Sequence, residues 1–139
     1  MIERRKSIEV PVGNLVIGGR HPIRVQSMTT SSSQDKEATI AQIMALQEAG
    51  CELIRVTIPD KASAANIPAY MSVMDVPFIA DIHFNHKMAL ASIAAGADKV
   101  RINPGNIGHE GRVMEVLEAA KAKGTALRIG VNSGSLEKD

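Results

Sequence analysis

The feature that most constrains this sequence is a regular alternation of strand-like and helix-like segments. Short β-type runs begin at about residues 23, 53, 77, 98 and 127, and helix-like stretches with short loops separate them. Strands that alternate with helices in this way form a parallel sheet with helices packed outside it. The spacing, on average about 26 residues, suits the unit of a (β/α)8 barrel. It suits a doubly wound sheet almost as well.

Turn and cap residues set the boundaries of the expected elements. Residues 7–12 and 15–17 flank Gly13-Asn14 and predict a short N-terminal β-hairpin. Asp35 is placed to cap a helix that ends at Gly50, with a buried stripe of Ile40, Ile43, Met44 and Leu46. The strands of the main body are expected at residues 23–27, 53–58, 77–81, 99–103 and 127–132.

Two further breaks complete this set of boundaries. Pro68 must fall near a helix end or kink the helix that contains it. Residues 103–106, Asn-Pro-Gly-Asn, cannot continue a strand and predict a loop directly after the fourth strand.

The charge pattern along the strands decides between the two folds. Successive side chains of a strand point to opposite faces, and in four consecutive strands one face collects most of the polar side chains. That face carries Arg55, Thr57, Asp81, His83, Lys99, Arg101, Asn103, Arg128 and Asn132. The opposite face is apolar and includes Ile54, Val56, Phe78, Ala80, Val100, Leu127, Ile129 and Val131. Both faces of a doubly wound sheet are covered, so a single polar face predicts a barrel with a polar lumen.

Positive charge is in excess on this polar face. Three arginines, Arg55, Arg101 and Arg128, are joined by Lys99, and Asp81 is the one candidate carboxylate. Burying an unpaired guanidinium costs several kcal/mol after relaxation. Arginine also meets phosphate oxygens in pairs, so the pattern predicts a phosphate or diphosphate site. The alternative is that some of these side chains point to solvent because the sheet is incomplete.

Two other features allow a functional or a purely structural interpretation. His83, two residues after Asp81, is placed either to orient a ligand or move a proton, or to serve as a hydrogen-bonded structural residue. The turn at residues 103–106 is a common structural signal, and its position after a cationic strand makes an anion contact an equal alternative.

Composition limits the other classes of function. The chain has 139 residues, expected as one domain over residues 1–139, and its net charge of +1 does not favour nucleic acid or anionic lipid as a partner. A single cysteine, Cys51, rules out an internal disulfide and a CxxC metal pair, and His21, His86 and His109 show no metal-ligand spacing with each other. The first residues lack the apolar run of a signal peptide, and no membrane span is present, so a cytoplasmic location is expected.

Several motifs together resemble one enzyme family over almost the whole chain. They are Val-Gln-Ser-Met-Thr at residues 25–29, Asp-Ile-His-Phe at 81–84, Lys-Val-Arg-Ile-Asn-Pro-Gly-Asn-Ile-Gly at 99–108, Arg-Ile-Gly-Val-Asn at 128–132 and Gly-Ser-Leu at 134–136. Their order and their residues resemble those of the N-terminal barrel of the 4-hydroxy-3-methylbut-2-enyl diphosphate synthases. A related barrel, such as a pterin-binding synthase, would not account for residues 101–108.

The resemblance implies a TIM barrel that binds 2-C-methyl-D-erythritol 2,4-cyclodiphosphate and a second domain that holds a [4Fe–4S] cluster. Ferredoxin or flavodoxin would supply two electrons in this isoprenoid pathway, and the enzyme would be a homodimer. Matched by motif, the diphosphate-binding arginines would be Arg55, Arg101 and Arg128, with Asn103 and Asn132 as amide partners. The substrate-binding mouth of the barrel would also be lined by Asp81 and His83.

The chain departs from the family pattern in its extent. It provides about five of the eight βα units of a barrel and none of the cluster's cysteines. We therefore expect an N-terminal portion of the enzyme, inactive alone. The alternative is a stand-alone phosphate-binding or self-assembling half-barrel without redox activity.

Overall fold

The N-terminal part of the chain forms the predicted hairpin. The structure, a computed structural model, describes residue 3 and residues 5–135, so Leu136 of the last motif lies outside the described residues. Strands β1 (Val10–Val12) and β2 (Leu15–Ile17) pair antiparallel. Gly13 in the turn between them has a φ of 56°, a conformation that glycine adopts without steric cost. The hairpin is confirmed, with a first strand shorter than expected.

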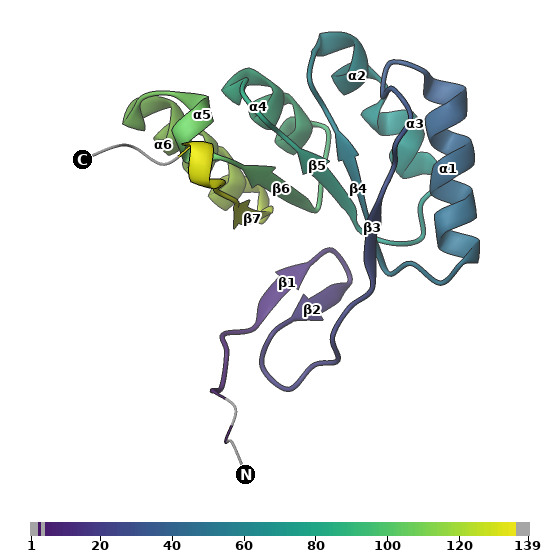
Figure 1. Cartoon of the computed structure of the whole chain (residues 1–139), viewed down its shortest axis with the longest axis horizontal. Coiled ribbons are helices and arrows are strands. Elements are labelled where there is room, and N and C mark those ends of the chain that lie inside the picture. Colours follow the sequence, from purple (N-terminus) through teal and green to yellow (C-terminus); the bar gives the residue numbers. More distant parts are fainter. Residues whose placement is uncertain (1–2, 4, 136–139) are drawn as a thin grey trace.

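The main body is a five-stranded parallel sheet (Figure 1). Its strands are β3 (Gln26–Met28), β4 (Leu53–Thr57), β5 (Phe78–Asp81), β6 (Lys99–Ile102) and β7 (Ala126–Ile129). Each strand pairs with the next one along the chain. A doubly wound sheet would reverse this order at its switch point, whereas a barrel is built sequentially. The predicted α/β fold with a partial barrel is confirmed.

The first strand of this sheet begins later than expected. The predicted strand covered residues 23–27, but β3 starts at Gln26, and Ile23 and Val25 are exposed. The amide of Val25 donates to the carboxylate of Glu52 at 2.8 Å and does not enter the ladder. A side chain therefore replaces the expected strand partner at this point.

The helices lie along the outer side of the curved sheet (Figure 1). They are α1 (Lys36–Glu48), α2 (Lys61–Ala65), α3 (Ile67–Ser72), α4 (His86–Ala94), α5 (Pro104–Ile107) and α6 (Glu110–Lys123), and a short 3-10 turn follows at Ser133–Ser135. Asp35 caps α1 by accepting a hydrogen bond from the amide of Ala38 at 3.0 Å, as predicted. Pro68 lies in the first turn of α3, where a missing N–H costs little.

Residues 103–106 do not form the predicted loop. Helix α5 begins at Pro104, and Asn103 caps it by accepting a hydrogen bond from the amide of Gly105 at 3.2 Å. The expectation of a loop was wrong because Asn followed by Pro is also an N-cap followed by the first helical residue. The strand nevertheless ends where the sequence indicated.

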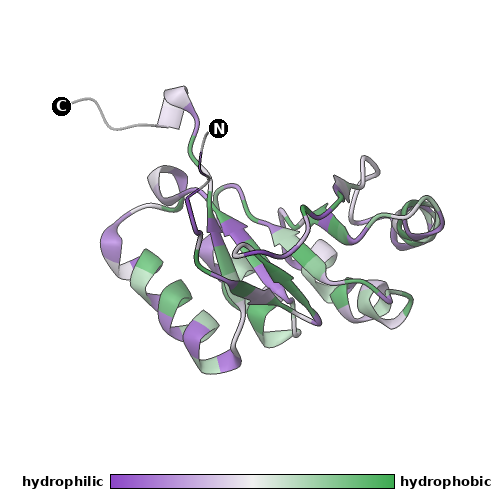
Figure 2. Ribbon diagram, turned by 90° about the horizontal axis from the view of Figure 1, so that it is seen from below, coloured by the Kyte–Doolittle hydropathy of each residue, from purple (hydrophilic) through white to green (hydrophobic). Residues whose placement is uncertain are grey.

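The two faces of the sheet differ in the way the sequence predicts. The outward face packs against the helices in one large core that includes Ile54, Val56, Phe78 and Val100. Hydrophobic and hydrophilic residues consequently lie next to each other along the strands (Figure 2). Three residues depart from the prediction, since Met44, Ile129 and Val131 are exposed. Met44 lies on α1, Ile129 ends the edge strand β7, and Val131 follows this strand.

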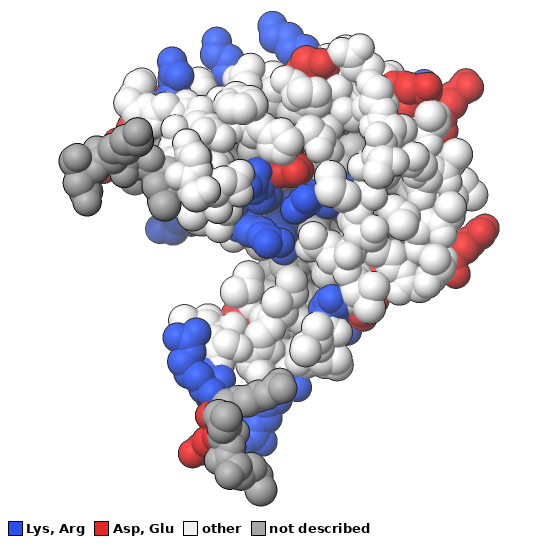
Figure 3. Space-filling model, in the orientation of Figure 1, with Lys and Arg blue, Asp and Glu red and all other residues white. Residues whose placement is uncertain are grey.

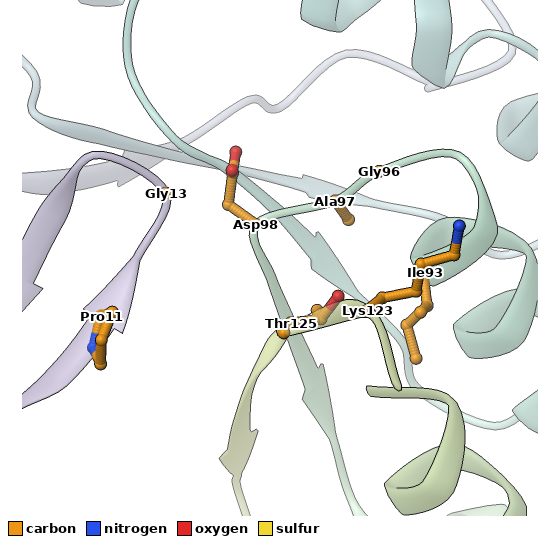
Figure 4. A pocket seen from close by; sticks show the side chains of 9 residues that line it. Pro11, Gly13, Ile93, Gly96, Ala97, Asp98, Lys123 and Thr125 are labelled. Carbon is orange, nitrogen blue, oxygen red and sulfur yellow. The ribbon is translucent and has the colours of Figure 1, made fainter. Parts of the chain in front are cut away.

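The hairpin closes the sheet at the end where the strands begin. Val12 packs with Leu53 and Ile79 in a second, smaller core. Beside it lies a cavity of about 210 Å³, bordered by Pro11, Asp98 and Thr125 (Figure 4). None of the predicted site residues lines this cavity. In the described part of the chain, no helix is both long enough and apolar enough to cross a membrane.

Candidate functional site

Strand register brings the predicted site residues into two adjacent rows. Asp81 on β5 lies opposite Thr57 on β4 and Arg101 on β6, and Arg101 in turn lies opposite Arg128 on β7. In the second row, two residues closer to the start of the strands, Arg55 and Lys99 flank Ile79. Because side chains two residues apart on a strand point to the same face, both rows face the inner side of the sheet.

Asp81 is the centre of the site. Its side chain is 3% exposed, and its carboxylate lies 3.5 Å from Nε of Arg55, 3.4 Å from a terminal nitrogen of Arg101 and 3.2 Å from Nε2 of His83. These three partners come from β4, from β6 and from the segment after β5. A single buried carboxylate therefore holds together side chains from three consecutive βα units.

The positive charges outnumber this carboxylate. We call Arg55, Lys99, Arg101 and Arg128 the cationic cluster. Lys99 is buried, and this burial together with the charges of Arg128 and Arg55 lowers the pKa of its ammonium group. With Asp81 as the carboxylate in contact with it, the cluster retains an excess of positive charge among the described residues.

One nitrogen in this cluster lacks a partner. Nε of Arg55 is buried, and among the described residues it makes no hydrogen bond, since its approach to Asp81 at 3.5 Å is a charge contact only. Leaving a buried polar group unpaired costs about 1–3 kcal/mol. Because protein atoms cover this nitrogen, a ligand would have to bind the terminal nitrogens of Arg55, whose side chain is 25% exposed.

The cluster lies in a hollow on the inner side of the sheet. Figure 3 shows basic atoms grouped around an acidic one above the hairpin. Lys99 and Arg128 also border a cavity of about 490 Å³ that extends toward the hairpin, where Arg24 and His21 contribute further basic side chains. Arg55 and Arg101 do not border this cavity, so it lies beneath the contacts of Asp81, toward the start of the strands.

The two predicted amide partners occupy different environments. Asn103 is fully buried, and its side chain is committed to the cap of α5 and to a hydrogen bond donated to Oγ of Ser135 at 2.9 Å. Asn132 is exposed and directly precedes the 3-10 turn at Ser133–Ser135. Asn103 lies two residues after Arg101 of the cluster, directly after β6. Its side-chain amide cannot cap α5, bond Ser135 and contact a substrate with the same atoms at once.

His83 lies at the rim of the site. Its ring contacts Asp81 and meets the ring of Phe84 edge to face, with the ring centres 6.2 Å apart. Its side chain is 46% exposed, so the imidazole is open to a ligand entering from above the strands. Both interpretations made from the sequence therefore remain compatible with its position.

Two residues at the site were not among the predicted ones. The hydroxyl of Ser135 accepts hydrogen bonds from Asn103 and from the amide of Asn132, and it donates to the carbonyl of Asn132. It thereby ties the segment after β7 to the end of β6. Gly130, the second, lies against the guanidinium of Arg101. Both belong to quoted motifs, but only side-chain geometry shows what they contact.

The described residues contain no group of three or more His, Cys, Asp or Glu side chains that could hold a metal ion. Cys51 is buried under the start of β4, where its thiol donates to the carbonyl of Leu53 at 3.0 Å. It acts as a small core residue.

Comparison with known proteins gives a clear family match. Residues 7–139 match the family described as the GcpE TIM-barrel domain. A protein of Halalkalibacterium halodurans named 4-hydroxy-3-methylbut-2-en-1-yl diphosphate synthase (flavodoxin) is 54% identical over 135 residues, which is 97% of this chain and 37% of that protein. A protein of the same name from Caldanaerobacter subterraneus subsp. tengcongensis is 51% identical and is covered to 39%. The chain thus spans less than half the length of these curated relatives.

Solved structures of low sequence identity share the fold. A dihydropteroate synthase of Xanthomonas albilineans matches with a TM-score of 0.65 at 17% identity, covering 94% of this chain and 52% of that one. A mandelate oxidase matches with a TM-score of 0.54 at 18% identity, covering 80% of this chain and 43% of the other. At such identities the likeness concerns the fold alone.

Proposed function

The chain belongs to the family of the GcpE TIM-barrel domain, and on this premise we propose that it forms the diphosphate-binding part of a 4-hydroxy-3-methylbut-2-en-1-yl diphosphate synthase. The family resemblance seen in the sequence motifs is confirmed by this match. The enzyme is an oxidoreductase that opens the ring of 2-C-methyl-D-erythritol 2,4-cyclodiphosphate in isoprenoid biosynthesis. The observation that carries the proposal is the excess of positive charge on the inner side of the sheet, where the four basic side chains of the cationic cluster gather around the single carboxylate of Asp81.

The cationic cluster would bind and orient the diphosphate. Guanidinium groups of Arg55, Arg101 and Arg128 offer paired donors to phosphate oxygens, and Lys99, in the same row as Arg55, adds a further positive charge. Held in this way, the carbon framework of the substrate faces away from the sheet. The same donors would stabilise the negative charge that develops on the departing phosphate oxygen as the ring opens. With two electrons and one proton supplied, the carbon–oxygen bond to phosphate would break, leaving the oxygen on the phosphate, and a hydroxyl would leave as water.

Asp81 would act on the arginines more than on the substrate. Its carboxylate contacts both Arg55 and Arg101, which fixes the direction of the two guanidinium groups before a ligand arrives. A preorganised cation loses less conformational entropy on binding. We propose that His83, Asn103 and Asn132 complete the rim of the same site, with His83 the most accessible contact for the substrate.

The electron-transfer group does not fit the residues of this chain. A [4Fe–4S] cluster is held by cysteine thiolates, whereas Cys51 is the one cysteine in the sequence and is buried in the core. We propose that a separate domain of the enzyme binds the cluster, which would deliver electrons when present. The relatives are named for flavodoxin, so we propose flavodoxin as the donor, with ferredoxin as the alternative. A cytoplasmic homodimer that acts without nucleic acid or membrane completes the proposal.

The proposal is tested by replacing a cluster arginine. Arg101→Ala should weaken binding of the cyclodiphosphate by about 10- to 100-fold, because a charge-assisted pair of hydrogen bonds contributes about 1.5–3 kcal/mol. Isothermal titration calorimetry on the enzyme purified from its source measures this affinity directly. The iron–sulfur absorption spectrum should not change.

Arg20→Ala is the matched control for charge. Arg20 is exposed in the loop after β2, outside the cationic cluster, and its replacement removes one positive charge, as Arg101→Ala does. We expect this variant to bind the cyclodiphosphate as the parent does. Equal affinity of the Arg101→Ala variant and the parent would remove the site assignment.

A further inference from the structure

We propose that Gly130 is a positioning residue, which sets the orientation of the Arg101 guanidinium by leaving the space that a side chain would fill. A Cβ atom built at Gly130 would lie 2.5 Å from Nε, 3.0 Å from a terminal nitrogen and 3.2 Å from Cζ of Arg101. Contacts below 3.0 Å are not tolerated between such atoms, so one group would have to move. The flat guanidinium therefore lies directly over the backbone of β7's C-terminal end.

The backbone at this position does not itself require glycine. Gly130 is absent from the glycines with positive φ, so an alanine would adopt the same backbone conformation without strain. Its amide donates to the carbonyl of Ile102 at 2.9 Å, a hydrogen bond that alanine would also make. The three atoms nearest to the Cβ of an alanine at this position would all belong to the guanidinium of Arg101.

The orientation that results is the one the site uses. A terminal nitrogen of Arg101 reaches Asp81 at 3.4 Å across the neighbouring strand, while its Nε edge rests on Gly130. The guanidinium is held between a carboxylate on one side and bare backbone on the other. A methyl group at position 130 would push the Nε edge away from β7 and tilt the remaining donors away from the direction of the ligand.

Because the guanidinium is the flexible end of a side chain, the fold itself should tolerate the change. Gly130→Ala is therefore expected to leave the unfolding midpoint close to that of the parent while it displaces Arg101. Gly134→Ala is the matched control, since Gly134 lies in the same segment, has no positive φ and has open space around its Cβ direction.

The inference rests on the proposed function, because it assigns Arg101 to diphosphate binding. The test is a double-mutant cycle of Arg101→Ala and Gly130→Ala in the full enzyme, read by calorimetry with the cyclodiphosphate and with inorganic pyrophosphate. Gly130→Ala alone should weaken binding by about 10-fold, within the range for a misplaced charge-assisted hydrogen bond. In the Arg101→Ala background the same change should cost nothing further, since the guanidinium it displaces is gone.

A second readout requires no ligand. The Nε–H signal of Arg101 in a nitrogen–proton NMR spectrum, assigned by its loss in Arg101→Ala, should shift in Gly130→Ala and stay in place in Gly134→Ala. An unshifted signal in Gly130→Ala, or equal losses of affinity from Gly130→Ala in both backgrounds, would overturn the positioning role. If Arg101→Ala binds like the parent, the proposed function fails instead, and the NMR result still decides whether Gly130 orients the guanidinium.

Discussion

The strongest prediction concerns Asp81, the carboxylate within the cationic cluster. Asp81→Asn removes its charge and keeps its shape. The two arginine contacts, at 3.5 and 3.4 Å, each have a Coulomb attraction of about 5 kcal/mol at an effective dielectric constant of 20. The cost of desolvating these groups offsets most of that attraction, and removing one partner from a buried ion pair is known to cost about 3–5 kcal/mol.

The lower end of that range applies here. The side chains of Arg55 and Arg101 are 25% and 15% exposed, so both guanidinium groups can turn partly toward water once the carboxylate is lost. We expect a loss of about 3 kcal/mol in the free energy of unfolding. With a typical urea m-value near 1.5 kcal/mol per molar, the unfolding midpoint should fall by roughly 2 M.

Pyrophosphate extends this test to the site. In the Asp81→Asn variant the arginines lack their carboxylate, so an added anion should raise the midpoint more than it does in the parent. Urea unfolding followed by circular dichroism, with and without pyrophosphate, measures both effects. Asp75→Asn serves as the control, because Asp75 is exposed and its replacement should change the free energy by less than about 0.5 kcal/mol. A parent-like midpoint for Asp81→Asn would refute the central role of this carboxylate.

Two further predictions follow from single residues. The pKa of Lys99 is lowered, so the folded state disfavours its charge; this penalty is fully present below the lowered pKa and disappears as the pH rises toward about 10.4, the value in the unfolded chain. Lys99→Met should therefore raise the free energy of unfolding at neutral pH and reduce its further increase at alkaline pH. Urea titrations at pH 7 and pH 10 would measure both effects, and a variant less stable than the parent at pH 7 would contradict this. Gly124→Ala should destabilise by about 1 kcal/mol in the same titration, because Gly124 ends α6 with a φ of 69°, whereas Gly134→Ala should be neutral; equal midpoints for both variants would contradict the left-handed cap.

The sequence was sufficient for the architecture because its signals are local and periodic. Strand alternation separated the face of Arg101 from that of Val100, and the structure places Val100 in the helix-packed core and Arg101 in the lumen. Caps such as Asp35 also act within a few residues of the chain. Such features depend on the nearest neighbours in sequence, so they can be read without three-dimensional information.

Features that depend on distant neighbours were harder to predict. Met44 on α1 and Ile129 at the end of the edge strand β7 have the right period for burial, but they remain exposed. Residues 103–106 are compatible with a turn and with a helix capped by Asn103, so the sequence did not distinguish the two. The use of the Asn103 amide depends on Ser135, which is 32 residues away in the chain. The role of Gly130 depends on the path of one side chain from the neighbouring strand, which no pattern within a single strand records.

The most direct test of the central claim is a crystal structure of the enzyme with the bound cyclodiphosphate. If the cationic cluster is the diphosphate site, phosphate oxygens should lie about 2.7–2.9 Å from terminal guanidinium nitrogens of Arg55, Arg101 and Arg128. A ligand bound elsewhere in the barrel, with no phosphate oxygen on these guanidinium groups, would contradict the assignment of the cationic cluster as the diphosphate site.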